Sequence, residues 1–459
     1  MKIKTNAIIG LIFLSLLGFV YFYEIKGGEE RRKEAEQSKQ LLDFKETEVE
    51  RIELVRGDTT IVLAKGTEGW KINAPLVDRA DQEAAERYLR NLAESEREKT
   101  VVDSAAATPE QAAQYGLAAP RLEIALGIED GTEQALAFGA DSPTDRFTYV
   151  QELGANPEIF VVRAWRFDNL DKSVFDLRDR RVLAFRKDDV VEVRRSGAVG
   201  AVVLAREDGD WRVREPIAAL ADKDAIEDLL DKLNTDEIEA FVAEDPDIEA
   251  LKGYGFEEST GMEVALLVGD DRAEKRLTIG RDNGQGYYYA RDASRPQVFL
   301  VDSTLVQELA SSVDELRDKK PLRFDRDAVV RIALTRGGIS EFAADKDTAG
   351  VWSLSEPAGR ETKSWKLNSL LGDLGQLEVE GFAEVLPAAA TEALHIELFG
   401  GDQGNLDIRI SRVAEAFYLQ SGDDGAVYII GTDAFAGLDL SLDDVAQAAQ
   451  EPTPAADGG

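Results

Sequence analysis

The chain has 459 residues, with 54 Lys and Arg against 89 Asp and Glu, one His and no Cys, and its formal net charge is −35. This composition excludes disulfides, thiolate metal sites, a cysteine nucleophile and metal centres with several histidines. The acidic excess argues against nucleic acid as a partner, because phosphates would be repelled. Hydrophobic residues make up 44% of the chain, which is enough for buried cores, and the length suits about three domains.

The sequence predicts a membrane anchor near the N-terminus. A short basic head at 1–6 precedes an uncharged apolar run at 7–23, which as a helix would reach about 25 Å, close to the thickness of the bilayer core. The residues at its end are bulky or charged instead of small, which favours an uncleaved transmembrane helix over a cleaved signal peptide. Cations on both flanks leave the orientation open by charge alone. The short head before the apolar run favours a body outside the cytoplasm.

Charged and polar segments flank the main body of the chain. Residues 24–43 mix Glu with Lys and Arg at spacings that allow ion pairs on a helix surface, which predicts a charged helical stalk. At the other end, 447–459 is rich in Pro, Ala, Asp and Gly and is predicted to be a disordered tail.

An internal repeat dominates the region between these segments. A tryptophan recurs every 141 residues, and each is followed five positions later by a proline. The recurrent residues are Trp70, Trp211 and Trp352, with Pro75, Pro216 and Pro357. Repetition at a fixed period predicts tandem copies of one structural unit. We place these modules at 44–184, 185–323 and 324–446.

Each module shows the same succession of elements. Alternating apolar residues precede the tryptophan and predict antiparallel strands joined by Gly- and Asp-rich turns. After the proline, apolar residues at i, i+3, i+4 and i+7 predict one amphipathic helix, for example around Leu89 and Leu92. Further strands follow. The predicted fold is α+β, with three tandem related modules of mostly antiparallel sheet plus helices, behind an N-terminal transmembrane helix.

Two further motifs occur in the first two modules. A Tyr-Gly element follows the helix, and a Leu-Arg-Asp segment ends the module. Their residues are Tyr115 and Gly116, Tyr254 and Gly255, and the arginines Arg178 and Arg317. The third module lacks both motifs and is the degenerate, terminal copy.

The W-x4-P pattern, the helical stripe, the Y-G-L-x-x-P element at 115–120 and the closing L-R-D resemble a bacterial family of unknown function. Its members are single-span membrane proteins associated with ABC transporters of the gliding-motility type, as auxiliary components. The resemblance covers nearly all of 44–446. It implies a bacterial inner-membrane protein with most of its chain in the periplasm, and ABC transporter subunits as partners. It supplies no catalytic residues.

The recurrent residues have structural and functional interpretations. The tryptophans are either sugar-stacking platforms or core residues, and their recurrence in three copies favours the core. The prolines suit turns and helix entry. Arg178 and Arg317 each precede an Asp, and a bidentate ion pair that fixes the end of the module is favoured over an anion site.

Three isolated features of the sequence are candidate sites. Residues 345–356 partly match a calcium loop, but Trp352 falls inside it, so a hairpin turn is favoured. The aromatic run 287–289 with Phe299 is a candidate patch for a glycan or peptide, with at least one face in the core. His395 lies in an alternating strand without a nucleophile motif and is predicted to be a surface or strand residue.

These observations predict no catalytic, cofactor-binding or metal-binding residue. The expected function is a non-enzymatic, membrane-anchored periplasmic scaffold or docking protein. A carboxylate-dependent hydrolase of envelope polymer stays open as an alternative, because 89 acidic residues make any chosen pair uninformative. A polysaccharide- or ligand-binding module is the other alternative.

Overall fold

The computed structural model describes residues 39–103, 107–154, 157–257, 261–400, 404–422 and 425–447. The predicted head, the anchor at 7–23, most of the stalk and all of the tail except its first residue lie outside the described residues. None of the helices within the described ranges has the length and apolar character needed to cross a bilayer.

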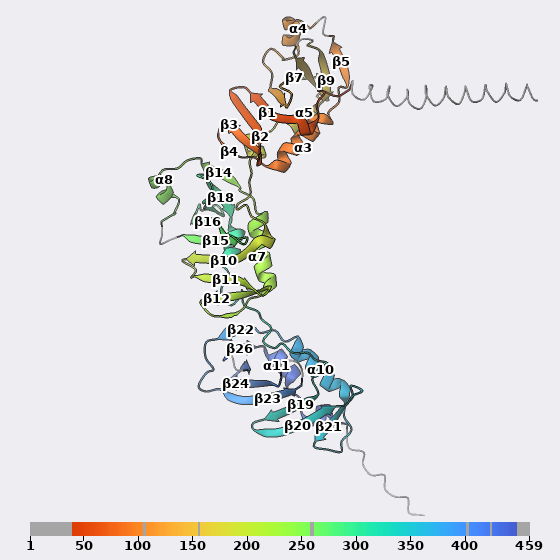
Figure 1. The fold of residues 1–459 in the computed structure, drawn as a ribbon, viewed down its shortest axis with the longest axis vertical. Helices are drawn as coiled ribbons and strands as arrows, with labels where there is room; N and C mark the ends of the chain where they lie inside the picture. Colours follow the sequence, from red (N-terminus) through yellow and green to blue (C-terminus); the bar gives the residue numbers. More distant parts are fainter. Residues whose placement is uncertain are drawn as a thin grey trace, which may run out of the picture. The chain divides into compact units, whose positions relative to one another are not determined.

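The body of the chain consists of three antiparallel sheets, each accompanied by helices (Figure 1). The predicted fold of mostly antiparallel sheet plus helices is therefore confirmed for the described residues. We keep the names module 1, module 2 and module 3 for the three sheets with their helices. The chain divides into two compact units between Arg180 and Arg181, and the second unit contains modules 2 and 3.

Module 1 is built on a nine-stranded sheet. Its elements are η2 (Glu46–Glu48), β1 (Val49–Arg56), β2 (Thr59–Gly66), β3 (Gly69–Ala74), β4 (Asp78–Arg79), α3 (Gln82–Ala93), β5 (Lys99–Val102), α4 (Pro109–Gln114), β6 (Leu122–Ile128), β7 (Glu133–Asp141), β8 (Phe147–Leu153), β9 (Ile159–Arg163), α5 (Ala164–Leu170) and α6 (Val174–Leu177). The strand order is β4-β3-β2-β1-β6-β7-β8-β9-β5. Two hairpin-connected meanders therefore meet where β1 pairs with β6.

The helix α3 carries the chain from β4 at one edge of the sheet to β5 at the other. Asp81 caps its first turn by accepting a hydrogen bond from the backbone N–H of Ala84. The predicted apolar stripe, which includes Tyr88, Leu89 and Leu92, is buried against the sheet. A helix that connects opposite edges must cross one face of the sheet, and it covers the core on that face.

Module 2 repeats this arrangement. Its elements are η4 (Lys187–Asp189), β10 (Val190–Gly197), β11 (Val202–Glu207), β12 (Asp210–Glu215), β13 (Ala219–Leu220), α7 (Lys223–Thr235), β14 (Ala240–Ala243), α8 (Ile248–Gly253), β15 (Met262–Val268), β16 (Ala273–Asp282), β17 (Tyr287–Asp292), β18 (Val298–Asp302) and α9 (Ser303–Leu309). The strand order β13-β12-β11-β10-β15-β16-β17-β18-β14 matches that of module 1 strand for strand.

Module 3 is a reduced copy with eight strands. Its elements are β19 (Arg331–Arg336), β20 (Ile339–Lys346), β21 (Trp352–Glu356), α10 (Ser364–Gly375), β22 (Gly381–Ala383), β23 (Thr391–Phe399), β24 (Leu406–Val413), β25 (Ala416–Ser421), β26 (Val427–Ile430), α11 (Thr432–Leu438) and α12 (Leu442–Val445). The order is β21-β20-β19-β23-β24-β25-β26-β22. The segment between β22 and β23, which is fully described, contains no counterpart of α4 or α8, in line with the missing Tyr-Gly motif.

Each module begins a few residues earlier than the sequence predicted. A Leu-x-Phe segment leads into the first strand of every module, at 42–44, 183–185 and 322–324. The leucines are at most 5% exposed and belong to the three separate cores. The predicted boundaries at 43, 184 and 323 cut through these segments, because a short apolar segment before the first strand carries no periodic signal of its own.

Candidate functional site

The three recurrent tryptophans lie in the hydrophobic cores, as the repeat predicted. Trp70 and Trp211 are 3% exposed and Trp352 is 1% exposed. They occupy the third strand of the first meander in their modules, on β3, β12 and β21. Since a buried indole cannot offer its face to a sugar ring, these side chains serve the fold.

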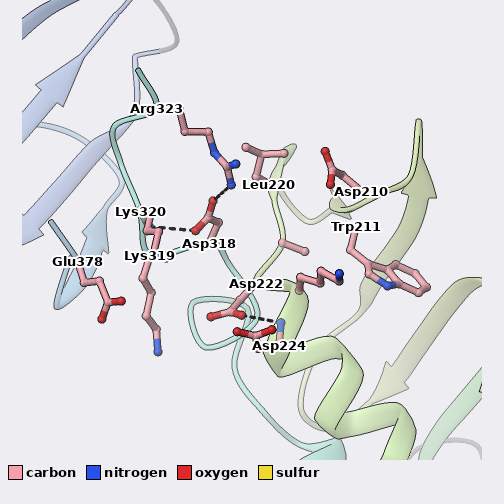
Figure 2. A pocket seen from close by; sticks show the side chains of 12 residues that line it. Asp210, Trp211, Leu220, Asp222, Asp224, Asp318, Lys319, Lys320, Arg323 and Glu378 are labelled. Atoms are coloured by element: carbon pink, nitrogen blue, oxygen red, sulfur yellow. Dashed lines mark hydrogen bonds and ion pairs between the residues drawn. The ribbon is translucent and has the colours of Figure 1, made fainter. Parts of the chain in front are cut away.

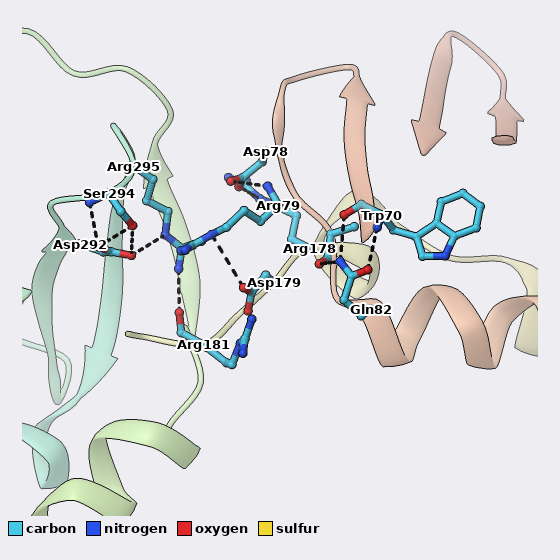
Figure 3. A network of polar contacts seen from close by, with 11 residues as sticks. Trp70, Asp78, Arg79, Gln82, Arg178, Asp179, Arg181, Asp292, Ser294 and Arg295 are labelled. Atoms are coloured by element: carbon cyan, nitrogen blue, oxygen red, sulfur yellow. Dashed lines mark hydrogen bonds and ion pairs between the residues drawn. The ribbon is translucent and has the colours of Figure 1, made fainter. Parts of the chain in front are cut away.

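The peptide group of the tryptophan is bonded differently in the three modules. Gln82 accepts a hydrogen bond from the N–H of Trp70 at 2.6 Å and donates one to its carbonyl at 2.9 Å (Figure 3). In module 3, Ser364 Oγ accepts from the N–H of Trp352 at 3.1 Å. Lys223 stands at the corresponding place in module 2, and an ammonium group has no acceptor. Among the described residues of module 2, no side chain forms the bond that closes this end of the other modules.

The recurrent prolines follow the tryptophan strands. Pro75 and Pro216 lie between the third and fourth strands of their modules, and Pro357 lies in the turn after β21. All three are preceded by a cis peptide bond. The predicted location in turns before the main helix is confirmed for each of them.

The Tyr-Gly element of module 1 brings the backbone after α4 directly onto β7. The N–H of Ala140 donates to the carbonyl oxygen of Tyr115 at 2.8 Å. A Cβ atom on Gly139 would lie 2.2 Å from that oxygen, and one on Gly116, whose φ is +75°, would lie 2.8 Å from the Ala140 nitrogen. Only glycine permits two backbones to cross so closely, which explains why a glycine follows the tyrosine in both copies of the motif.

Module 2 repeats the crossing with Tyr254 and Gly255. The N–H of Arg281 donates to the carbonyl oxygen of Tyr254 at 2.9 Å, and a Cβ on Gly280 would lie 2.3 Å from that oxygen. In both modules the tyrosine ring of the element packs on a tyrosine of the sheet. The pairs are Tyr115 with Tyr149 and Tyr254 with Tyr289, with ring centroids 4.5 and 4.8 Å apart. The Tyr-Gly elements therefore hold a short helix on the sheet.

The Leu-Arg-Asp segment of module 1 closes the module through its backbone and one buried ion pair (Figure 3). The N–H of Asp81 donates to Leu177 O at 2.9 Å, and that of Asp179 donates to Arg79 O at 3.0 Å. Arg178 donates from Nε and Nη2 to Asp78 Oδ2 at 2.9 and 2.6 Å, and both side chains are at most 4% exposed. The predicted ion pair exists, but its carboxylate is on β4 instead of in the motif.

Arg317 keeps the backbone role and loses the buried carboxylate. The N–H of Asp318 donates to Leu220 O at 3.0 Å, as in module 1. The place of Asp78 is taken by Ala219, so the guanidinium lies 3.5 Å over the ring of Phe382 in module 3. Its nearest carboxylate is that of Asp314, at 3.4 Å. In the second unit the end of module 2 therefore contacts module 3 through a cation–π pair.

A polar pocket opens in the second unit beside the first turn of α7 (Figure 2). Its volume is about 430 Å³, and its lining includes Trp211, the start of α7, the segment 318–323 after Arg317, and Glu378 of module 3. Lys223 lies in this lining, at the position where the other modules carry Gln82 and Ser364. The pocket therefore adjoins the tryptophan strand that lacks the closing side-chain bond.

The pocket carries charges of both signs. Asp222 caps α7 by accepting from the N–H of Asp224 at 3.0 Å. Asp318 pairs with Arg323 and accepts from the backbone N–H of Lys320 at 3.0 Å (Figure 2). The remaining charged groups of the lining are the cations Lys223, Lys319 and Lys320 and the acids Asp210, Asp224 and Glu378. Alternating charges of this kind suit a polar partner segment with charges of its own.

The sequence did not predict this pocket. Its lining combines residues of module 2, the segment 318–323 and Glu378 of module 3, and the repeat carries no signal for the proximity of segments so far apart in the chain. A signal was nevertheless present at Lys223, which replaces the acceptors found in modules 1 and 3. At this position the departure from the repeat coincides with the loss of a structural hydrogen bond beside the pocket.

The calcium-loop candidate is a hairpin turn, as predicted. Between β20 and β21, Asp347 Oδ1 accepts from the N–H groups of Ala349 and Val351 at 2.9 and 2.8 Å. The carboxylate is thus occupied by its own turn. Trp352 follows directly on β21 and is buried.

The aromatic candidate is divided between the two faces of β17. Tyr289 packs on Tyr254 and Tyr288 packs against the module 2 core, while Phe299 is fully buried. The expectation that one face belongs to the core is confirmed. His395 lies on β23 as predicted, and its Nε2 is 3.0 Å from Asp407 Oδ2.

Sequence comparison identifies the repeat. The model of a family described as a domain of unknown function, DUF4340, matches the chain twice, at 70–248 and 211–398. Each match begins at a recurrent tryptophan and runs past the next one, so one family unit is longer than one module. Neither a curated protein nor a solved structure matches the chain. Because the two matches together cover well over half of its residues, the chain belongs to the DUF4340 family.

Proposed function

We propose that this protein is a membrane-anchored, non-enzymatic scaffold in the periplasm that serves an ABC-type export or gliding-type transporter as an auxiliary component. The apolar run at 7–23 supports the anchor, and the resemblance to single-span proteins associated with such transporters supports the partner class. The recurrent residues support an architectural role, because they build the cores and the backbone contacts of the modules.

The observation that carries the docking role is the pocket in the second unit. It combines three lysines and one arginine with five acidic side chains, in a lining shared by module 2, the segment after Arg317 and module 3. Charges of both signs at one place favour a specific polar partner and oppose a uniformly charged polymer. The proposed occupant is a polar segment of a transporter subunit.

Affinity purification of the full chain from membranes of its own host tests the proposal. Permease and ATPase subunits of an ABC-type transporter should be recovered with the chain and identified by mass spectrometry. Deletion of 7–23 should abolish recovery, since the anchor holds the chain beside its partner. The double variant Lys319→Glu/Lys320→Glu should lower recovery, because it reverses two charges of the pocket.

Lys252→Glu is the matched control, because Lys252 is an exposed lysine on α8, outside the pocket lining. It should leave recovery unchanged. Equal losses for the control and the pocket variant would contradict a docking role for the pocket. Hydrolysis of an envelope polymer by the purified chain, stopped by one Asp or Glu substitution without unfolding, would replace the scaffold with the hydrolase alternative.

A further inference from the structure

Three potential metal ligands meet on the sheet of module 3. His395 and Glu397 are two residues apart on β23, and Asp407 lies on the neighbouring strand β24. One ligand atom from each residue lies within 4.8 Å of the others. Ile396 and Ile408 beside them are fully buried in the core, so the three polar side chains share the opposite face of the sheet.

The strand register explains why the three side chains converge. Glu397 is directly opposite Asp407 in the pairing of β23 with β24. His395 is the diagonal neighbour, and its Nε2 reaches Asp407 Oδ2 at 3.0 Å. Directly opposed side chains on one face are the closest pairs that a sheet offers. The strand register therefore brings the three side chains to one place on the sheet.

The other two modules provide an internal comparison. Ile396 lies opposite Leu334 on the first strand of its module, as Ile124 lies opposite Leu54 and Val264 opposite Arg195. On this alignment the place of His395 is taken by Glu123 and Glu263. The pair Glu397 and Asp407 corresponds to Ala125 with Ala135 in module 1 and to Ala265 with Arg276 in module 2. The fold thus does not require the trio, which is present in one copy alone.

The pair Glu397 and Asp407 is also electrostatically unfavourable without a cation. Like charges placed directly opposite each other destabilise a sheet. Arg409 offsets part of the repulsion, because its Nε donates to Asp407 Oδ1 at 2.9 Å. Partial burial by itself would raise the pKa of Asp407, but hydrogen bonds from Arg409 and His395 hold this pKa below its ordinary value. A bound dication would offset the repulsion that remains between the two carboxylates.

We infer that His395, Glu397 and Asp407 form a binding site for a divalent first-row transition metal ion. A neutral imidazole nitrogen and two carboxylates supply a ligand charge of −2, which matches a dication. The imidazole favours zinc-type ions over magnesium and calcium, which prefer oxygen ligands alone. Three protein ligands leave further coordination positions open to water or to a partner group.

Zinc binding by the untagged full chain tests the site, since a histidine tag would add imidazoles. Calorimetry with Zn²⁺ should show one saturable site per chain. His395→Gln and Asp407→Asn should each weaken binding by more than about tenfold, the loss that even outer-shell changes cause. Glu123→Gln, at the place of His395 in module 1, should bind like the unmodified chain. Binding that ignores the His395 and Asp407 variants would overturn the site.

Two further measurements separate ligation from a structural role. Because the chain has a single His, NMR of the labelled imidazole reports on His395 alone, and Zn²⁺ should shift its resonances while millimolar Mg²⁺ should not. Arg409→Ala should tighten zinc binding, since it removes a cation that competes for Asp407. An unchanged imidazole spectrum, or weaker binding by Arg409→Ala, would contradict the inference.

Discussion

The same tryptophan is hydrogen-bonded in one module and unpartnered in another, which allows a matched pair of substitutions. In module 3 the indole Nε1 of Trp352 donates to Asn368 Oδ1 at 3.0 Å. In module 2 the place of Asn368 is taken by Glu227, which lies 3.6 Å from Lys223, and the buried Nε1 of Trp211 has no hydrogen-bond partner among the residues that the structure describes. We therefore expect Trp352→Phe to destabilise its module more than Trp211→Phe does.

The size of the difference follows from the two nitrogen environments. Both substitutions remove about the same apolar area, so that loss cancels in the comparison. Trp352→Phe also loses a hydrogen bond worth about 1 kcal/mol, whereas Trp211→Phe removes a buried unsatisfied donor that costs about 1 to 3 kcal/mol. Trp352→Phe should therefore lower the free energy of unfolding of module 3 by about 2 kcal/mol or more beyond the loss that Trp211→Phe causes in module 2.

Hydrogen exchange with mass spectrometry measures this difference, because it follows the strands of each module separately within the full chain. A difference of about 2 kcal/mol corresponds to an opening equilibrium about thirtyfold larger in the module 3 variant than in the module 2 variant, each relative to the unmodified chain. Equal loss of protection in the two modules would refute the reasoning, as would a greater loss in module 2.

Two further predictions concern single buried contacts of module 2. Burial alone would raise the pKa of Glu192, but hydrogen bonds from Arg272 and Arg194 at 2.6 and 2.5 Å lower this pKa. The ionised carboxylate therefore stabilises module 2 at pH values above its unfolded-state pKa, and this stabilisation is lost as the pH falls through the lower folded-state pKa. Glu192→Gln should thus destabilise module 2 by about 1 to 3 kcal/mol at neutral pH. The variant should also lose less stability on acidification than the unmodified chain, and an unchanged pH profile of unfolding would contradict this. Gly280→Ala should lower the free energy of unfolding of module 2 by about 1 to 3 kcal/mol and expose α8 to hydrogen exchange, because the new Cβ would lie 2.3 Å from Tyr254 O. Gly253→Ala is the control and should have neither effect, because its Cβ would meet no atom within 4 Å.

The sequence predicted those parts of the fold that depend on periodic patterns. The spacing of Trp70, Trp211 and Trp352 revealed three copies, and the apolar stripe around Leu89 placed the helix that crosses each sheet. Both signals are local, since they arise from residues on one strand or on one helix face. For the same reason, the predicted stalk at 24–43 includes Leu42, because the burial of this residue depends on contacts with the distant core of module 1.

The candidate sites depend on long-range pairing and could not be predicted in this way. Arg178 was expected to form an ion pair, but its partner Asp78 is 100 residues away in the chain. The proximity of Glu397 to Asp407 follows from the register of two strands, and the sequence pattern does not determine that register. Lys223, the segment 318–323 and Glu378 line one pocket although they are far apart in the chain.

A chain with three copies of one fold separates structural from functional positions without any related sequence. A residue that agrees in all copies, such as Trp70, satisfies a demand of the shared backbone, and substitution there acts on stability. A residue that departs in one copy, such as Lys223 or His395, is released from that demand and is free to serve a partner or an ion. On this reasoning, a module 2 variant that carries Lys223→Gln should regain the tryptophan-closing bond and become more stable, while its recovery of transporter subunits falls. Gains in both properties would show that the departure at Lys223 has no function.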